Sequence, residues 1–141
     1  MMYLLDTNVV SELRKAGSGK ADRRVTAWAS RVPAESMFLS AVSILELELG
    51  VLQMERRDAK QGDILRVWLE KRVLAAFAGR ILAIDTAVAR QCATLHAPNP
   101  RPYRDSLIAA TALVHGMTVV TRNVKDFKAT GVAMLDPWQP R

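Results

Sequence analysis

The feature that most constrains the fold of this chain is a regular alternation between short apolar segments and longer amphipathic ones. The short segments predict strands at residues 3–5, 37–40, 81–84, 118–121 and 132–135. The longer segments predict helices at residues 9–14, 25–29, 42–57, 64–77, 86–96 and 105–114. Strands that alternate with helices pair in parallel, because each helix carries the chain back across the sheet. The sequence therefore predicts an α/β fold in which helices cover a mainly parallel sheet of four to five short strands.

Length and composition limit the class of protein. A chain of 141 residues with 50% hydrophobic content can bury one core, and no composition break marks a second domain, so residues 1–141 are predicted to form one domain. The chain has no apolar run of about 18 residues and no leader-like start, which predicts a cytoplasmic protein without a membrane partner. Cys92 is the only cysteine, so one chain can form neither an internal disulfide nor a thiolate metal cluster.

The net charge points to a polyanionic partner. A formal charge of +6 and a pI near 10.0 favour binding to nucleic acid or to an acidic protein segment. We expect about half of the basic side chains to be plain surface charge. Those that could follow a phosphate backbone are Arg14, Lys15, Lys20, Arg23, Arg24, Arg101, Arg104, Arg122, Lys125 and Lys128.

Asp6 directly follows the first predicted strand, where the core would hold it and the solvent would still reach it. In open α/β sheets, ligands bind in the crevice beyond the carboxyl ends of the strands, so Asp6 is a candidate metal or phosphate ligand. The alternative is that Asp6 only caps the helix that begins near Val9, a common role for aspartate. At this point both readings stand.

Two further acids fall where the same crevice would form. Asp105 opens a helix that is apolar nearly all round and therefore buried, and Asp126 lies just past the fourth strand. In a parallel sheet these positions and Asp6 can share one edge, and clustered carboxylates repel one another unless a divalent cation lies among them. Oxygen ligands of this kind suit Mg²⁺ or Mn²⁺. The alternatives are a helix cap for Asp105 and a turn for Asp126.

The two middle helices carry the remaining patterned residues. In the helix predicted at 42–57, leucines recur at core spacing, and either Glu46 or Glu48 could face the crevice. The helix predicted at 64–77 presents one apolar face and is interpreted as structural. The leucines of the first helix are Leu45, Leu49 and Leu52, and the apolar face of the second consists of Leu65, Leu69, Val73 and Phe77.

Four segments in this order resemble the motifs of PIN-domain ribonucleases, and more narrowly those of the VapC and FitB-like toxins of toxin–antitoxin pairs. They are residues 4–8 (LLDTN), Glu46 with Gly50, residues 105–112 (DSLIAATA) and residues 120–127 (VTRNVKDF). The resemblance extends from Met2 to about Leu135. It implies a three-layer PIN-like fold and a metal-dependent endoribonuclease, the toxin of a type II toxin–antitoxin system.

The resemblance also implies a site. Asp6, Glu46, Asp105 and Asp126 would be the catalytic residues and would hold one or two Mg²⁺ or Mn²⁺ ions. Glu46 is preferred to Glu48 because of the Glu-to-Gly spacing of the family. Around these ligands, Thr7, Asn8 and Thr121 would orient the carboxylates through their hydroxyl and amide groups. Arg122 would contact an RNA phosphate.

The fourth ligand is the open point of this assignment. Some relatives carry an acid where Asn123 stands, and asparagine offers a carbonyl oxygen but no charge. We predict Asp126 as an outer or water-mediated ligand, with Asn123 as its hydrogen-bonding neighbour. The alternative is that Asn123 and Asp126 only form a turn that ends at Phe127.

Two other classes of function remain possible from the sequence. An aspartate-nucleophile phosphatase would need a second acid two residues after Asp6, where Asn8 stands. A non-catalytic RNA- or protein-binding module would leave the acids structural, which the retention of all of them argues against. Metal-free RNA cleavage would require positioned histidines, whereas His96 and His115 lie at helix ends.

The expected partners follow from the resemblance and the apolar excess. We expect an RNA substrate, a cognate antitoxin protein, and a homodimer that joins the antitoxin in a hetero-oligomer. Leu45, Leu49, Leu65, Leu69 and Phe77 are more apolar side chains than a core of this size readily accommodates.

Overall fold

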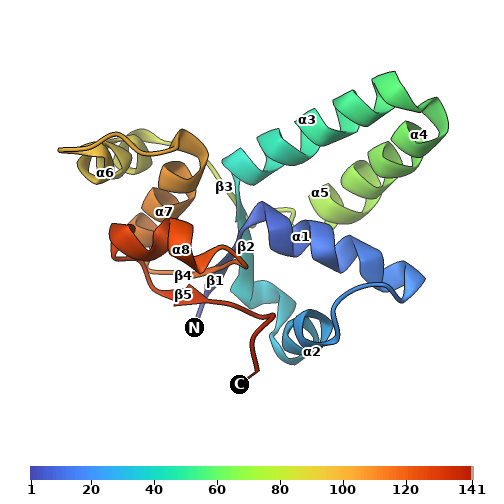
Figure 1. Ribbon diagram of the computed structural model, residues 1–141, viewed down its shortest axis with the longest axis horizontal. Helices are drawn as coiled ribbons and strands as arrows, with labels where there is room; N and C mark the ends of the chain where they lie inside the picture. The colour runs from blue at the N-terminus through green and yellow to red at the C-terminus, as the bar shows by residue number, and fades with distance from the viewer. Residues whose placement is uncertain (141) are drawn as a thin grey trace.

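The sheet of the computed structural model, which describes residues 1–140, has five parallel strands in the order β3-β2-β1-β4-β5 (Figure 1). Every pairing between neighbouring strands is parallel, which confirms the predicted sheet. The strands β1 and β2 have the predicted bounds, whereas β3, β4 and β5 are shorter than predicted. Their bounds are β1 Tyr3–Leu5, β2 Met37–Ser40, β3 Ile81–Leu82, β4 Thr118–Val120 and β5 Met134–Leu135.

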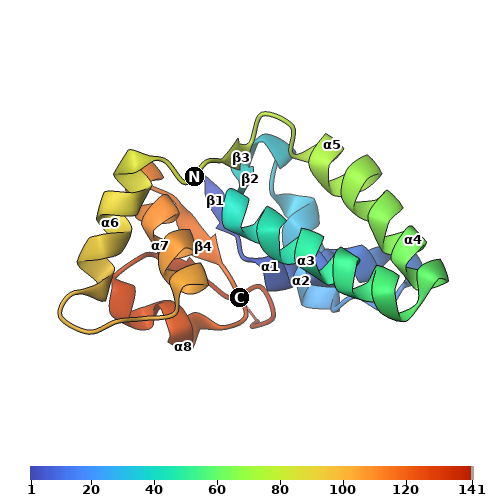
Figure 2. The same cartoon turned by 90° about the horizontal axis from the view of Figure 1, so that it is seen from above.

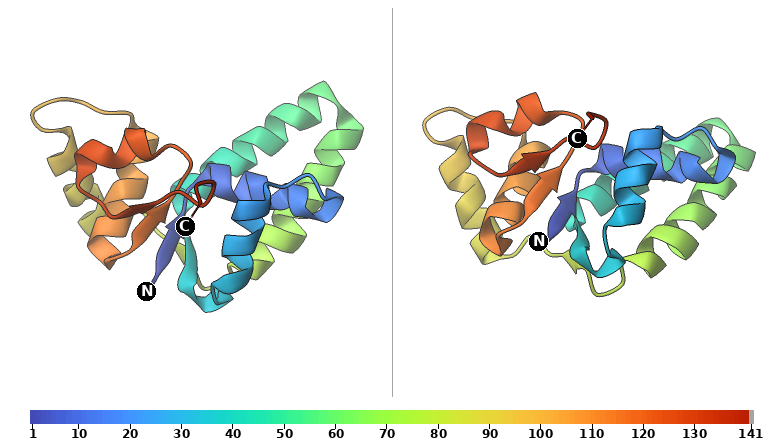
Figure 3. Two further views of the ribbon diagram at one scale, coloured as in Figure 1. Left: turned by 60° about the horizontal axis from the view of Figure 1, so that its bottom comes forward. Right: turned by 90° about the horizontal axis from the view of Figure 1, so that it is seen from below.

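Helices cover both faces of the sheet (Figures 1, 2 and 3). The helices α1 to α5 pack on one side, and α6, α7 and α8 lie beside β4 and β5. The bounds are α1 Thr7–Arg14, α2 Arg23–Arg31, α3 Ala41–Arg57, α4 Ala59–Val67, α5 Leu74–Ala76, α6 Thr86–His96, α7 Tyr103–His115 and α8 Val124–Phe127. A π-helical stretch, Trp68–Val73, joins α4 to α5. Residues 123–127, predicted as a turn, contain the short helix α8, and residues 15–18, predicted as loop, form a 3₁₀ turn.

Two apolar cores lie on opposite faces of the sheet, because successive strand side chains point to opposite sides. Leu5 and Val120 face the core built with α1, α2, α3 and the π-helical stretch. Leu4 and Val119 face the core built with α7 and α8. The predicted three-layer arrangement is therefore confirmed.

The parallel register brings the carboxyl ends of β1 and β4 to the same edge. Leu5 pairs with Val120, so the residues that follow each strand, Asp6 and Thr121, lie next to each other. The Asp6 amide donates to the Val120 carbonyl oxygen at 2.8 Å, which extends the pairing by one residue. At this edge, hydrogen bonds join the side chains of Asp6, Asn8 and Thr121.

The leucine stripe of α3 does not face the core, so that prediction was wrong. Leu45, Leu49 and Leu52 are 55%, 38% and 47% exposed, whereas Leu47 and Val51 are buried. The leucines and the buried residues are both at helical spacing, and only the docking of α3 on the sheet decides between the two faces. The face formed by Leu65, Leu69, Val73 and Phe77 does pack into the first core, as predicted.

The helices α3 and α4 form an antiparallel arm that extends from the sheet (Figures 1 and 2). Arg66 on α4 donates to Glu48 at 2.5 Å and to Glu55 at 3.0 Å, both on α3. At Gly62 the helices approach so closely that a Cβ atom would lie 2.5 Å from the Glu55 Cα. The arm is thus held by an ion-pair cluster and by backbone contact.

Candidate metal centre

Asp6 caps α1 and also lies at the cleft, so the two interpretations that the sequence left open do not exclude each other. Its carboxylate accepts a hydrogen bond from the Thr7 amide at 2.8 Å and so caps α1. It also accepts from the Thr121 hydroxyl at 2.8 Å and from the Asn8 amide group at 3.3 Å. Burial raises the pKa of Asp6, and the charges of Glu46 and Asp126 add to that effect against the opposing hydrogen bonds. The cap therefore fixes a carboxylate whose charge is poorly solvated.

A cleft of about 460 Å³ opens beside Asp6 at the carboxyl edge of the sheet. Three of the predicted acids line it, contributed by three separate elements. Its lining residues are Asp6, Thr7, Asn8, Ser11, Glu12, Lys15, Glu46, Asp105, Arg122, Asn123 and Trp138. The folded chain thus brings together carboxylates that lie far apart in the sequence.

Glu46, and not Glu48, faces this cleft. The Thr7 hydroxyl donates to Glu46 Oε1 at 2.8 Å, and Arg104 approaches Glu46 Oε2 at 3.5 Å. Glu48 pairs instead with Arg66 in the arm. Thr7 therefore links the end of β1 to α3, and it orients the Glu46 carboxylate toward Asp6.

Asp105 enters the cleft from the first turn of α7. Its pKa is raised from 3.8 to about 6, first by partial burial and then by the charges of Asp6, Asp126 and Glu46. Three carboxylates therefore act on the fourth through space. A positive charge placed among them would stabilise all of them in their ionised form.

Asn123 and Asp126 differ in their relation to the cleft. Asn123 lines it, and its amide donates to the Thr121 hydroxyl at 2.9 Å. Asp126 is exposed on α8 and is not part of the lining, although its charge raises the pKa of both Asp6 and Asp105. Its backbone amide donates to the Asn123 carbonyl oxygen at 2.9 Å. Asp126 is thus close enough for its charge to act on Asp6 and Asp105, but it does not line the cleft.

The donor set suits a hard cation that retains water. Among residues 1–140, no group of three or more His, Cys, Asp or Glu side chains is gathered closely enough to enclose an ion. Mg²⁺ commonly binds through one or two carboxylates and completes its octahedron with water and substrate phosphate oxygens. Carboxylates spread around an open cleft, with asparagine and hydroxyl oxygens between them, fit that mode of binding.

Some cleft residues were not predicted. Trp138 reaches the cleft because the tail after β5 folds back, which no local sequence pattern reveals. Lys15 and Arg104 were named only as general basic residues, yet both lie at the site. His96 and His115 do not line the cleft, and His96 Nδ1 instead accepts from the Arg101 amide at 3.2 Å.

Comparison with known proteins gives a match over nearly the whole chain. The family model described as PIN domain matches residues 3–132. VapC ribonuclease Y4jK of Sinorhizobium fredii is 40% identical over 144 residues, which covers 99% of this chain and 99% of that protein. Toxin FitB of Neisseria gonorrhoeae is 39% identical over 143 residues, which covers 97% of this chain and 99% of that protein.

Solved structures agree with the sequence matches. A chain in the crystal structure of FitAcB from Neisseria gonorrhoeae has a TM-score of 0.89 and 38% identity, covering 99% of this chain and 100% of its own length. A chain in the structure of FitAB bound to the IR36 DNA fragment has the same TM-score at 36% identity, covering 99% of this chain and 98% of its own length.

Within residues 1–140, the helices are too short or too polar to cross a membrane.

Proposed function

The chain belongs to the PIN-domain family, and we propose that it is a Mg²⁺-dependent endoribonuclease acting as the toxin of a type II toxin–antitoxin pair. The observation that carries this proposal is the convergence of Asp6, Glu46 and Asp105 on one cleft from β1, α3 and α7. The names of the relatives, a VapC ribonuclease and a FitB toxin, support the same activity. We also propose that residues 1–141 act as one nuclease domain.

The residues of the cleft have distinct roles in this proposal. Asp6, Glu46 and Asp105 would hold one or two ions, with Asp126 acting from outside, and Mn²⁺ could replace Mg²⁺. When bound, the metal would lower the pKa of a water molecule and offset the negative charge that builds on the phosphate. Thr7 and Thr121 orient the carboxylates through the hydrogen bonds at 2.8 Å.

The basic side chains of the cleft would bind the substrate. Arg122 and Lys15 both line it, and Arg122 is exposed beside Asn123. Their charges attract the RNA backbone toward a cleft whose own acids would otherwise repel it. Arg122 can donate two hydrogen bonds to one phosphate, which would fix the chain of the RNA relative to Asp105.

The decisive experiment compares RNA cleavage by the purified protein in Mg²⁺ and in excess EDTA. We expect cleavage only with Mg²⁺, and ends without a 2′,3′-cyclic phosphate, because water and not the RNA 2′-hydroxyl attacks phosphorus. Equal cleavage in EDTA, or 2′,3′-cyclic phosphate ends, would contradict the metal-dependent mechanism. RNA that is bound but never cut would support the binding-module alternative.

Two partner proteins are part of the proposal. The exposed face formed by Leu45, Leu49 and Leu52 offers apolar surface for association, consistent with a homodimer. A cleft lined by acids on a chain of charge +6 suits an antitoxin that is acidic overall and inserts a basic side chain. Co-purification with the product of the neighbouring gene, and light scattering of the free chain, test the two parts separately.

A further inference from the structure

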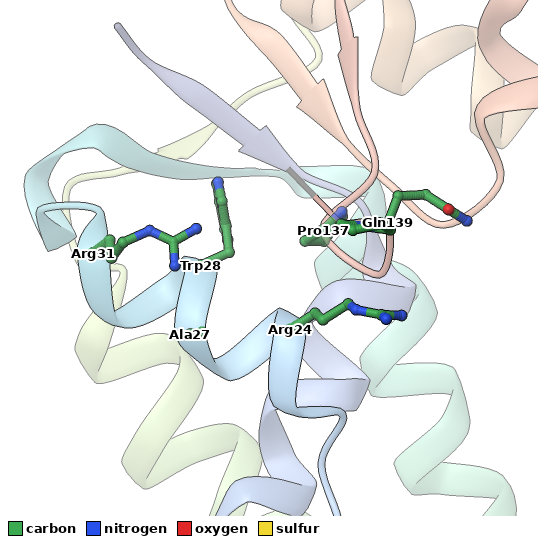
Figure 4. A pocket seen from close by; sticks show the side chains of 7 residues that line it. Arg24, Ala27, Trp28, Arg31, Pro137 and Gln139 are labelled. Carbon is green, nitrogen blue, oxygen red and sulfur yellow. The ribbon is translucent and has the colours of Figure 1, made fainter.

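The C-terminal tail contributes a side chain to the cleft, although it lies beyond the family match that ends at residue 132. Trp138 is 9% exposed, and its indole lines both the cleft and the first core. Its amide donates to Asp136 Oδ1 at 2.9 Å, and Arg24 on α2 donates to its carbonyl oxygen at 3.3 Å. Figure 4 shows the tail at Pro137 and Gln139 lying against α2, with Arg24 extending beside it. The backbone of Trp138 is therefore held by Asp136 within the tail and by Arg24 on α2.

The guanidinium of Arg122 lies over the Trp138 ring, 5.2 Å from its centroid. The Arg122 amide donates to Asn8 Oδ1 at 3.4 Å, so its backbone is tied to the helix that follows Asp6. Among the described residues, no carboxylate lies within ion-pair distance of Arg122, in contrast to Arg66 and Arg104. The charge of Arg122 is thus placed at the cleft without being neutralised.

Stacking on an indole leaves an arginine ready to bind phosphate. A guanidinium that stacks on a ring uses its flat face, and its N–H donors, which lie in its plane, stay available to other partners. A free arginine must lose rotamer freedom when it binds, and a stacked arginine has already lost part of it. We infer that Trp138 is a positioning residue that holds Arg122 over the cleft to bind an RNA phosphate. This inference rests on the proposed ribonuclease function.

The kinetic test compares Trp138→Leu with the conservative change Trp138→Phe. Loss of the stacked ring should raise KM for a short RNA about threefold to tenfold, which is the effect of a partly exposed cation–π contact. The value of kcat and the Mg²⁺ midpoint should not change, because the contact is made equally in ground and transition states. Trp138→Phe should restore KM to within about twofold of the wild type. An unchanged KM in folded Trp138→Leu would overturn the inference.

A double-mutant cycle separates positioning from simple packing. Arg122→Gln should raise KM at least as much as Trp138→Leu, and combining both changes should add nothing, because they remove one interaction. Independent, additive effects would show that Trp138 acts by another route. Phe77→Leu is the matched control, since Phe77 carries a similar arginine contact, Arg80 at 5.1 Å, and does not line the cleft. It should leave KM unchanged.

A spectroscopic measurement keeps this inference separate from the proposed function. The indole N–H signal of Trp138, assigned by its absence in Trp138→Phe, should shift in NMR spectra of Arg122→Gln without any RNA present. A signal that does not move would show that the stacked pair does not form in solution. If the pair forms and wild-type protein cuts no RNA, the ribonuclease proposal fails while the contact stands. In that case the positioning role is overturned if an uncut RNA binds the wild type and Trp138→Leu equally well.

Discussion

Replacing Asp105 with asparagine should abolish RNA cleavage and also make the metal-free protein more stable. The substitution removes one carboxylate from the cleft and keeps nearly the same shape. Folding raises the pKa of Asp105 from 3.8 to about 6 through partial burial and then through the charges of Asp6, Asp126 and Glu46. At pH 7 the ionised side chain is therefore less favourable in the folded chain than in the unfolded one. Asparagine carries no charge and avoids this cost.

The size of the effect follows from the shift. A change from 3.8 to about 6 corresponds to about 3 kcal/mol, at 1.36 kcal/mol per pKa unit. Asp105 is partly exposed, and solvent screening reduces this to about 1–2 kcal/mol. In a domain of this size, about 1 kcal/mol moves Tm by roughly 3 °C. We expect Asp105→Asn to raise Tm by roughly 3–6 °C at pH 7 in EDTA.

The stability difference between Asp105→Asn and the wild type should depend on pH and on metal. Because the pKa is raised on folding, the folded state binds more protons between pH 3.8 and about 6, and wild-type stability falls as the pH rises through that window. The advantage of Asp105→Asn should therefore vanish near pH 4. Mg²⁺ should reverse the order at pH 7, because a cation stabilises the ionised carboxylate of the wild type.

Thermal unfolding followed by circular dichroism at several pH values, with EDTA or Mg²⁺, measures these effects. Asp63→Asn is a suitable control, since Asp63 is an exposed acid on α4 and does not line the cleft. A wild-type cleavage rate in Asp105→Asn would remove the residue from the site. A lower Tm at pH 7 in EDTA would refute the repulsion argument.

Three further predictions concern the fourth ligand, the arm and the dimer. Asp126→Asn should raise the Mg²⁺ midpoint of cleavage by weakening the local negative charge, and if only Asn123→Ala raises it, the roles of the two residues are reversed. Gly62→Ala should lower stability by about 1–3 kcal/mol in urea unfolding, because the added Cβ meets the Glu55 backbone. Gly50→Ala, with open space around it, should be neutral or stabilising, and an equal loss at both sites would refute the close-packing argument. Leu49→Ser should convert a dimer to a monomer in light scattering at micromolar concentration, and a wild type that is already monomeric would contradict the proposed dimer.

The alternation of strands and helices was enough to predict the layered fold, because hydrophobic period and connection handedness leave few arrangements. It could not predict which face of α3 is buried. Leu45 and Leu49 have the same helical spacing as Leu47 and Val51, so the local pattern supports either face. Exposed leucines are what a second binding surface requires, and a single-chain reading assigns them to the core by default.

The residues of the site could also be predicted only in part from the sequence. Sequence position predicted that Asp6 and Asp105 would share an edge, because the strands of a parallel sheet end at the edge where the helices that run back across it begin. It favoured Asp126 as an outer ligand with Asn123 as its neighbour, and it could not show that Asn123 lines the cleft and Asp126 does not, because the short helix α8 decides which side chain faces the cleft. Nor could it place Trp138, whose approach to Arg122 depends on a tail held by Arg24 and Asp136.

The acids and the cations of the cleft are positioned in different ways, which explains why the sequence predicts the acids better. Asp6 directly follows β1, Glu46 lies in the second turn of α3 and Asp105 in the first turn of α7, so backbone geometry sets their direction and a sequence motif can predict them. The cations around them are held by contacts between distant segments, as Arg122 is by Trp138 and Arg104 is by Glu46. Substitutions on rigid elements should therefore act on the chemical step, and substitutions at the distant contacts should act on substrate binding. Members of one family can then keep the same chemistry on the rigid elements while the distant contacts change which RNA is bound.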